Sequence, residues 1–451
     1  MATRNYELRI EDETLVRFSI ADGAFGESVR IRDVNDAAEA RMPLGLDLAG
    51  DGMIDWMAAR ALPQNRRFAQ ELCRVLGIAI GDTEGIYRVG LGLSLNDDYW
   101  VVPDGFAGRF ADYNLFENPF SAALSALAYT GVAPTGLGSG LTPDLTTDGS
   151  LRKAWRIGPG GERLLYKGAT PGHLPGEPLS EALASHLADR LGVDHAPYWL
   201  ERWEHTTCSV CADFADVRTS YVPFAVATGL TSFAGALWAA KNLGRDCFES
   251  LADMLVLDAL DCNTDRHLAN FGFLRDNSTG RLLGLAPAFD NGRALFPNLA
   301  DEDLDGLAAA VQATSPAFGP RTYDEQVARV LGPRQRAMLE RLASDGEALG
   351  DVAEASVGRT QALSALVRER AERLQALPPV DREELFSALD EHFVRNPPEV
   401  GTARRAAEAL RGAGDRHPGP SAEDVRRAVR ERARHDGYAG GDHPARSRGR
   451  M

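Results

Sequence analysis

Short apolar runs broken by polar residues characterise the first third of the chain. Residues 13–20 (ETLVRFSI) and 28–34 (SVRIRDV) have the alternation typical of strands, and residues 66–78 (RRFAQELCRVLGI) have apolar positions at helical spacing. A stretch dense in Gly, Pro, Thr and Asp follows at residues 130–150, with the composition of a connection between domains. The pattern therefore predicts a first domain over residues 1–140.

The next part of the chain combines a hairpin, a helix and aromatic strands. Residues 155–169 (WRIGPGGERLLYKGA) predict two strands joined by a Pro-Gly-Gly turn. Leucines at helical spacing predict a helix over residues 178–192, which a Ser-Glu pair opens and a glycine closes. Aromatic and β-branched residues at 196–203 and 218–226 predict further strands. This order indicates a small sheet with one packed helix, in a domain over residues 141–225.

Beyond the aromatic strands the pattern becomes helical. Apolar residues recur at helical spacing in FESLADMLVLDAL, DEQVARVLG, RQRAMLERLA and REELFSALDEHFV. These segments predict a helical domain over residues 226–400. Residues 401–451 carry twelve Arg against seven Asp or Glu, so we expect a basic, partly disordered tail there.

The composition is that of a folded globular protein. Of 451 residues, 44% are hydrophobic and 25% are charged, which excludes a wholly disordered or fibrous chain. The formal net charge of −16 disfavours a protein that binds nucleic acid through general attraction to phosphates. Contact with nucleic acid is therefore expected at most through the basic tail, for which a solvated helix is the alternative.

Cysteine usage and the start of the chain bear on location. Five cysteines, an odd and low number, indicate a reducing compartment, and the start lacks the basic-then-apolar pattern of a secretion signal. The uncharged residues 219–240 contain Pro223, Gly229 and Gly235, which argue against a membrane span. We therefore expect a cytoplasmic protein that does not contact a membrane.

The most informative stretch covers residues 257–296. An apolar helix ends in a polar cluster that contains Asp265 and Asn270, and two short predicted strands then precede Asp290. Phosphoryl transfer needs such groups, because a carboxylate must orient the acceptor hydroxyl and oxygen ligands must hold the Mg²⁺ that bridges the phosphates. Asp265 and Asn270 have the Asp-x-x-x-x-Asn spacing of kinase catalytic loops. The alternative is a helix end and a hairpin with ordinary turn residues.

Two motifs in this stretch resemble those of the HipA-type protein kinases. They are Asn263-x-Asp265-x-His267-x-x-Asn270 and the Ala-Pro-x-Phe-Asp sequence at residues 286–290. Three upstream segments resemble the family's phosphate-binding loop, its ATP-lysine strand and its helix with the partner glutamate: residues 147–153, 166–168 and 181–192. The resemblance spans about residues 141–300. It implies an α+β, two-lobed protein-kinase-like fold, here with an N-terminal accessory domain and a helical C-terminal extension.

The resemblance also implies a role for each matching residue. Asp265 would be the catalytic base, and Asn270 and Asp290 would hold Mg²⁺. Lys167 would bind the α- and β-phosphates of ATP, with Glu181 as its ion-pair partner. These roles fit the charge of a triphosphate, because about four negative charges beside two carboxylates need Mg²⁺ and a lysine to offset the repulsion.

Other residues of the predicted ATP site follow from the same resemblance. The loop would contact phosphates through Gly149, Ser150 and Lys153. The strand after the helix would present backbone groups to adenine near Val210, Cys211 and Phe214. His267 is interpreted either as a ligand or base, or as a residue that packs against the catalytic loop and holds Asp265 in place.

Some assignments keep an alternative. Ser150 is interpreted either as a site of autophosphorylation or as an ordinary turn or N-cap serine. The pair Cys208-x-x-Cys211 indicates either a structural segment or a zinc or redox site. Arg266 gives the pattern Asp-Arg-His-x-x-Asn that phosphatidylinositol kinases also show, but the acidic first 400 residues disfavour a lipid substrate. The glycines at residues 136–140 are interpreted as a linker.

The sequence thus predicts a kinase that uses Mg-ATP to phosphorylate a Ser or Thr hydroxyl of a protein, with itself as one candidate substrate. One alternative is a pseudokinase scaffold that binds without transferring phosphate. The other is a small-molecule phosphotransferase on the same fold. Residues 1–140 resemble the N-terminal extension of a subset of bacterial HipA-like proteins, so no toxin function is inferred.

Overall fold

The computed structural model describes most of the chain. The described residues are 3–23, 26–133, 140–169, 176–344, 348–350, 352, 354–399, 402, 405–406 and 409–410. The predicted basic tail and the predicted glycine-rich linker therefore lie almost entirely outside the described residues. Residues 1–413 pack as one unit.

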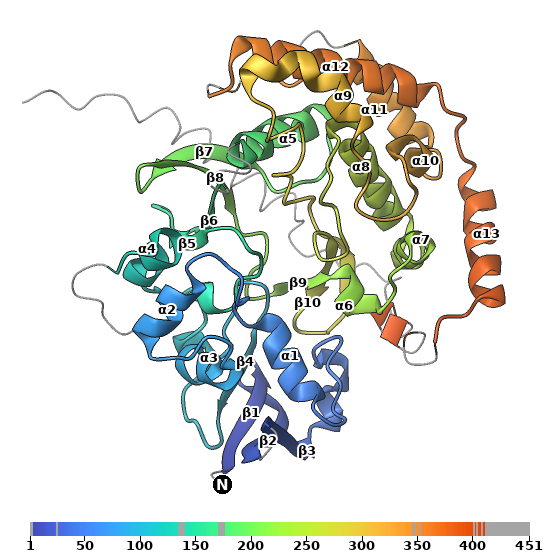
Figure 1. Ribbon diagram of the computed structural model, residues 1–451. Helices are drawn as coiled ribbons and strands as arrows, with labels where there is room; N and C mark the ends of the chain where they lie inside the picture. The colour runs from blue at the N-terminus through green and yellow to red at the C-terminus, as the bar shows by residue number, and fades with distance from the viewer. Residues whose placement is uncertain are drawn as a thin grey trace, which may run out of the picture. The chain divides into compact units, whose positions relative to one another are not determined.

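One antiparallel sheet organises the N-terminal region, a name we use for the described residues among 3–133. Its strands are β1 (Thr3–Ile10), β2 (Glu13–Gly23), β3 (Gly26–Val34) and β4 (Tyr99–Pro103), in the order β3-β2-β1-β4 (Figure 1). Val16, Phe18 and Ile20 alternate along β2 and are fully buried, as the period of a strand requires. The region's helices are α1 (Gly52–Arg60), α2 (Ala69–Leu76), α3 (Thr83–Gly90) and α4 (Ala122–Thr130). The two strands and the helix predicted here are confirmed.

A second antiparallel sheet carries the middle of the chain. Its strands are β5 (Lys153–Ile157), β6 (Arg163–Gly168), β7 (Tyr198–Trp203) and β8 (Thr206–Ala212), in the order β5-β6-β8-β7. β5 and β6 form the predicted hairpin, and α5 (Glu177–Leu191) packs on the sheet. The prediction of a small sheet with one helix is confirmed, except that the strand predicted at 218–226 belongs elsewhere.

The start of α5 differs from the prediction. The helix begins at Glu177 with Pro178 in its first turn, where a proline needs no hydrogen-bond donor. The Ser-Glu pair that was predicted to open the helix lies one turn inside it, and both side chains are buried. The helix ends as predicted at Gly192, whose φ of 73° is the left-handed conformation that glycine adopts readily.

A third sheet and the remaining helices form the C-terminal part. The sheet contains β9 (Thr219–Pro223), β10 (Gly272–Asp276) and β11 (Leu282–Leu285), in the order β11-β10-β9. The helices are α6 (Phe224–Thr228), α7 (Phe233–Leu243), α8 (Arg245–Asp261), α9 (Leu307–Gln312), α10 (Tyr323–Val327), α11 (Pro333–Ala343), α12 (Val357–Gln375) and α13 (Arg382–Arg395). The α+β class is therefore confirmed. β9 pairs with β10 rather than with β8, which corrects the predicted sheet.

Helix α8 is the centre of the C-terminal core. Its residues from Leu251 to Asp261 are buried on every face, so its end is fixed firmly. The chain leaves this helix at Cys262, which has a left-handed φ of 57°, and enters the stretch that contains Asp265. The predicted catalytic residues therefore follow the most deeply buried helix of the C-terminal part.

The uncharged residues 219–240 form a strand and two helices, β9, α6 and α7. None of the helices that the structure describes has both the length and the apolar character needed to span a membrane.

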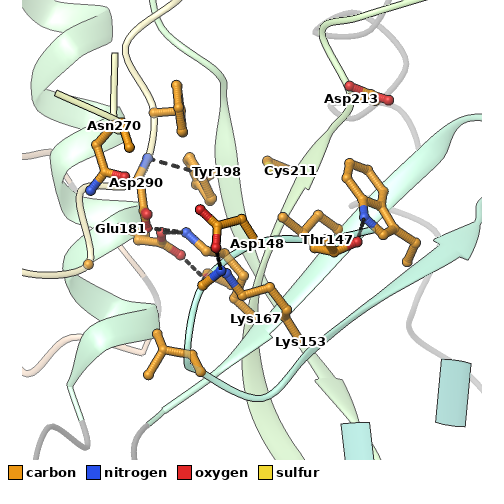
Figure 2. Close-up of a pocket in the computed structure, with 18 of the residues that line it drawn as sticks. Thr147, Asp148, Lys153, Lys167, Glu181, Tyr198, Cys211, Asp213, Asn270 and Asp290 are labelled. Atoms are coloured by element: carbon orange, nitrogen blue, oxygen red, sulfur yellow. Dashed lines mark hydrogen bonds and ion pairs between the residues drawn. The ribbon is translucent and has the colours of Figure 1, made fainter. Parts of the chain in front are cut away.

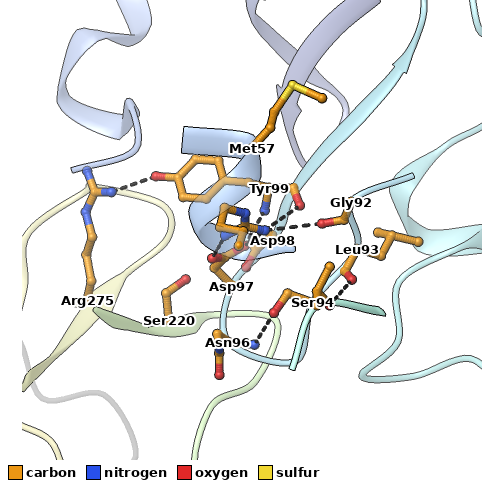
Figure 3. A network of polar contacts seen from close by, with 12 residues as sticks. Met57, Gly92, Leu93, Ser94, Asn96, Asp97, Asp98, Tyr99, Ser220 and Arg275 are labelled. Carbon is orange, nitrogen blue, oxygen red and sulfur yellow. Dashed lines mark hydrogen bonds and ion pairs between the residues drawn. The ribbon is translucent and has the colours of Figure 1, made fainter. Parts of the chain in front are cut away.

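Buried polar contacts join the N-terminal region to the C-terminal part (Figure 3). Arg275 of β10 donates a hydrogen bond of 2.6 Å to the hydroxyl of Tyr99, and the amide of Asn277 donates to Asp98. Arg60 pairs with Asp97 next to them. The end of the segment between α3 and β4 is therefore bonded to Arg60 of the N-terminal region and to Arg275 and Asn277 of the C-terminal part.

Asp98 is a fully buried carboxyl group in this junction. One of its oxygens accepts from Asn277, and the other has no hydrogen-bond partner among the described residues. Burial raises the pKa of Asp98 to about 9, and the charges of Asp97, Glu11 and Asp216 add to the shift. The side chain is therefore neutral in the folded protein at pH 7.

Replacing Asp98 by Asn is expected to stabilise the protein, and to do so more strongly as the pH rises. The unfolded carboxyl group ionises near pH 4, whereas the folded one keeps its proton up to about pH 9. Between these values the unfolded state binds fewer protons, so the free energy of unfolding of the wild type falls with rising pH. Asn has the same shape and no charge. Thermal unfolding should show a melting temperature about 2 °C or more above wild type at pH 8.

The pH series supplies the control for this substitution. The difference in melting temperature between Asp98→Asn and wild type should shrink as the pH falls from 8 to 5, because the wild-type penalty disappears. A difference that stays constant over this range would contradict a neutral Asp98.

Candidate active site

A cavity of about 320 Å³ lies where the second sheet meets the loops of the C-terminal part. Its lining comes from β5 to β9, from the loop before β5, from α5, from the two loops that flank the β10–β11 hairpin, and from residues 94–96 of the N-terminal region. The structure brings nearly all of the predicted site residues to this cavity: Gly149, Ser150, Lys153, Lys167, Glu181, Cys211, Phe214, Asp265, His267, Asn270 and Asp290. The exception is Val210.

A buried lysine between two carboxylates forms the polar centre of the cavity (Figure 2). The ammonium group of Lys167 contacts Glu181 of α5 and donates a hydrogen bond of 2.5 Å to Oδ1 of Asp290. Ser209 of β8 donates to the second oxygen of Glu181. Burial alone would lower the pKa of Lys167, but Asp290 and Glu181 outweigh it and raise the pKa well above its usual value. The lysine is therefore charged.

Asp290 follows the β10–β11 hairpin in a left-handed conformation, with a φ of 58°. Its side chain is about one-third exposed to the cavity. Burial would raise the pKa of this carboxyl group, but Lys167 and Lys153 outweigh burial and hold the pKa below its usual range. The carboxylate thus stays ionised beside an open space, in the state that can bind a cation.

The predicted catalytic loop is closed on itself by short hydrogen bonds. The side-chain nitrogen of Asn270 donates to the carbonyl oxygen of Asp265 at 2.8 Å, and the backbone N–H of Asp265 donates to Oδ1 of Asn263 at 3.0 Å. Because the nitrogen of the Asn270 amide is used within the loop, its oxygen remains available as a metal ligand. The Asp265 side chain lines the cavity.

Arg266, rather than His267, packs under the catalytic loop. Its guanidinium is buried and forms a two-pronged ion pair with Asp258 of α8. It also donates to the carbonyl oxygens of Asn270 at 2.9 Å and Phe289 at 2.5 Å. One side chain therefore joins α8, the loop with Asp265 and the segment with Asp290.

His267 is exposed at the rim of the cavity. Its backbone N–H donates to the carbonyl oxygen of Asp265 at 2.7 Å, and its ring Nδ1 accepts from the backbone of Ala269 at 3.2 Å. The buried contacts beneath the loop are thus made by Arg266, and the role of His267 stays a prediction.

The predicted phosphate-binding loop lies along one wall of the cavity. Gly149 has a φ of 92°, a conformation that favours glycine, and the ammonium group of Lys153 lies close to its Cα. Lys153 pairs with Lys167 across β5 and β6, and burial lowers the pKa of Lys153 to about 8. Ser150 is exposed at the tip of the loop.

The opposite end of the cavity is more apolar. Trp155, Leu165, Cys211 and Phe214 line it. The side chain of Val210 does not, because neighbouring residues of a strand point to opposite faces and Cys211 faces the cavity. It is fully buried on the other face, and the expected backbone contact to adenine near Val210 stays a prediction.

The cysteine pair of β8 is split by the same alternation. Cys208 contacts the hydroxyl of Tyr129 on α4, whereas Cys211 faces the cavity. Two side chains on opposite faces of one sheet cannot ligate one metal ion or form a disulfide. The structure favours the interpretation as a structural segment.

Several residues of the site were missed in the sequence. Ser209 donates to Glu181, and the hydroxyl of Tyr198 accepts from the backbone N–H of Asp290. The ring of Phe289 packs tilted against Phe214 and edge-on against Tyr221. The signal for Ser209 was its place two residues from Cys211 on the same strand, since alternate residues share a face. The signal for Arg266 was its position inside the motif itself.

No protein-family model matches the chain. The serine/threonine-protein kinase CtkA of Helicobacter pylori (strain J99) is 30% identical over 139 residues, which cover 27% of this chain and 42% of CtkA. The match to CtkA thus spans about two-fifths of that protein's length, and it confirms the resemblance to serine/threonine kinases that the motifs indicate.

Two solved structures match the chain. The crystal structure of the Helicobacter pylori proinflammatory kinase CtkA has 19% sequence identity and a TM-score of 0.43, and the match covers 54% of this chain and 93% of CtkA. A chain from the complex of HipA, HipB and operator DNA of Shewanella oneidensis MR-1 has 16% identity and a TM-score of 0.47, with 90% of this chain and 97% of that chain covered.

Proposed function

We propose that this protein is a HipA-like kinase that transfers the γ-phosphoryl group of ATP to a Ser or Thr hydroxyl of a protein. The observation that carries the proposal is the convergence of Asp265, Asn270 and Asp290, from two separate loops, on a buried Lys167–Glu181 pair in one cavity. The sequence similarity to a serine/threonine kinase supports the same chemistry.

The electrostatics of the cavity fit a magnesium nucleotide. Lys167 has three N–H donors, of which Glu181 and Asp290 use two, so one is left for a phosphate oxygen. Asp290 and the oxygen of Asn270 supply the hard oxygen ligands that Mg²⁺ prefers. The apolar end lined by Trp155 and Leu165 has the character of a purine site. When bound, Mg²⁺ would neutralise charge on the transferred phosphoryl group and its leaving oxygen.

In the proposed reaction the acceptor hydroxyl oxygen forms a bond to the γ-phosphorus as the bond from that phosphorus to the β,γ-bridging oxygen breaks. Asp265 orients the hydroxyl and accepts its proton, and ADP leaves. Lys167 and Lys153 hold phosphate oxygens, and Glu181 orients Lys167. Arg266 holds the loop of Asp265 and the segment of Asp290 together, because it donates to the carbonyl oxygens of Asn270 and Phe289.

The acceptor is proposed to be a protein, with this chain among the candidates. Ser150 is exposed on the phosphate-binding loop, where a second copy of the protein could phosphorylate it.

We also propose the domain boundaries given above, with residues 141–225 and 226–400 as the two lobes, and a cytoplasmic location.

Mass spectrometry of the whole protein and its peptides tests the proposal. Purified wild type and Asp265→Asn are each incubated with Mg-ATP alone and with a cell lysate. We expect new phosphate on serine or threonine with the wild type, on itself or on a lysate protein, and none with the variant. Asn keeps the size of the side chain but cannot accept the proton.

Two other results would replace the proposal. Binding of ATP without any phosphate transfer would indicate a pseudokinase scaffold. Consumption of ATP that depends on a small metabolite, with no protein labelled, would indicate a small-molecule phosphotransferase.

A further inference from the structure

The phosphate-binding loop, together with residues 144–146 that lead into it, is held by the N-terminal region and not by its own lobe alone; here the loop denotes residues 144–153. We call residues 62–67 of the N-terminal region the clasp segment. The backbone N–H of Leu62 donates to the carbonyl oxygen of Leu145 at 2.8 Å, and that of Arg67 donates to the carbonyl oxygen of Ser150 at 3.1 Å. The clasp segment therefore runs beside the whole loop.

Arg66 reaches from the clasp segment into the inside of the loop. Its side chain is only 1% exposed. One terminal nitrogen donates to the carbonyl oxygens of Asp144 at 3.1 Å and Thr147 at 3.2 Å, and the other donates to the Asp144 carboxylate at 3.2 Å and the carbonyl oxygen of Lys153 at 2.5 Å. A single guanidinium thus fixes the start, the middle and the end of the loop.

A second contact from the N-terminal region holds the same loop. The hydroxyl of Thr146 donates to the carbonyl oxygen of Leu93 at 2.7 Å. Leu93 precedes the segment that Asp97, Asp98 and Tyr99 fix in the junction of Figure 3. The loop is therefore attached to two rigid parts of the N-terminal region.

These contacts place the groups that face the phosphates. The backbone of Lys153 is bonded to Arg66, and its buried ammonium group lies against Gly149 in the cavity. A loop that is ordered before binding loses less conformational entropy when a ligand arrives, so it binds more tightly than a mobile one. The order of this loop depends on donors that only an arginine fork can supply together.

We propose that Arg66 is a positioning residue for nucleotide phosphates, through which the N-terminal region becomes an integral part of the ATP site. The inference rests on the proposed function, since it requires that the cavity binds ATP. It predicts a specific defect: loss of Arg66 weakens the interaction with phosphates and leaves the interaction with the base unchanged.

Calorimetric titration of the full chain with Mg-ATP, Mg-ADP and adenosine tests the inference. Arg66→Lys keeps the charge but loses the fork, and Thr146→Val removes the second contact at nearly constant volume. Arg382→Lys is the matched control, because Arg382 is also buried and donates to the carboxylate of Glu249 and the carbonyl oxygen of Val330, yet it does not line the cavity. Melting temperatures are recorded for every variant.

For Arg66→Lys we expect the affinity for Mg-ATP to fall about 10-fold or more, that for Mg-ADP to fall less, and that for adenosine to stay within about 2-fold of wild type. Thr146→Val should show the same order with smaller changes. Arg382→Lys should lower the melting temperature without changing the ratio of ATP to adenosine affinity. Equal loss for all three ligands, or no loss, in the folded variants overturns the inference alone. A wild type that binds none of the ligands overturns the proposed function as well.

Discussion

Replacing Asp290 by Asn is expected to lower the rate of phosphate transfer by about 10³-fold while leaving the fold intact. The carboxylate of Asp290 is ionised beside the cavity and pairs with Lys167, so the substitution removes the proposed metal ligand and one of the two negative charges that pair with the lysine. Asn has nearly the same size and adopts the left-handed conformation more readily than most residues, so the φ of 58° is kept. The measurement is the rate of ATP turnover as a function of Mg²⁺ concentration.

The same variant separates the role of Asp290 in catalysis from a role in folding. Its melting temperature should stay close to that of wild type, and its binding of ATP should lose most of its dependence on Mg²⁺. Asp276→Asn is the control, because this aspartate lies in the turn of the same hairpin, outside the cavity. Wild-type turnover in a normally folded Asp290→Asn protein would refute the assignment of the metal site.

The parts of the site that are close together in the sequence were predictable from it. Asp265 and Asn270 are five residues apart, and the hairpin after them fixes where Asp290 must return. The pairing of Lys153 with Lys167 follows from the hairpin that the Pro-Gly-Gly turn closes. Local spacing decides these contacts because each element can fold in only a few ways.

Contacts between residues far apart in the sequence could not be predicted from local spacing. The pattern of apolar residues showed that β9 is a strand, but not that it pairs with β10 instead of β8, because period-two alternation carries no information about the partner. Arg66 lies 78 residues before Asp144, and nothing in its neighbourhood marks it as a residue of the loop. The positioning role proposed for Arg66 rests on the folded structure, in which its guanidinium lies 3.2 Å from the Asp144 carboxylate.

Arg266 shows that a sequence also does not predict the burial of a residue within a recognised motif. It lies inside the recognised motif, where it indicated only the pattern that phosphatidylinositol kinases share. A sequence cannot distinguish an exposed arginine in such a loop from a buried one, because the difference depends on whether Asp258, eight residues earlier on α8, points toward it. Burial of both side chains makes Arg266 the main link between the two catalytic segments.

Replacing Arg266 by Met is therefore expected to destabilise the protein by about 3–5 kcal/mol, the largest stability effect that we predict. The variant leaves the Asp258 carboxylate buried without its partner, and it also removes donors to the carbonyl oxygens of Asn270 and Phe289. Thermal and urea unfolding measure the effect. Arg373→Met is the control, because Arg373 is 69% exposed in its ion pair with Asp324, and its loss should cost less than about 1 kcal/mol.

A double variant identifies the origin of this loss. The main cause of the loss is expected to be the uncompensated charge of Asp258. In that case the free energy of unfolding of the double variant Arg266→Met/Asp258→Asn should fall by less than the sum of the two single losses. The double variant contains neither an unpaired carboxylate nor an unpaired guanidinium. Turnover should not recover with stability, because the donors that join the loops of Asp265 and Asp290 are still missing. Additive losses would show that the packing of the arginine stem, and not the ion pair, stabilises this junction.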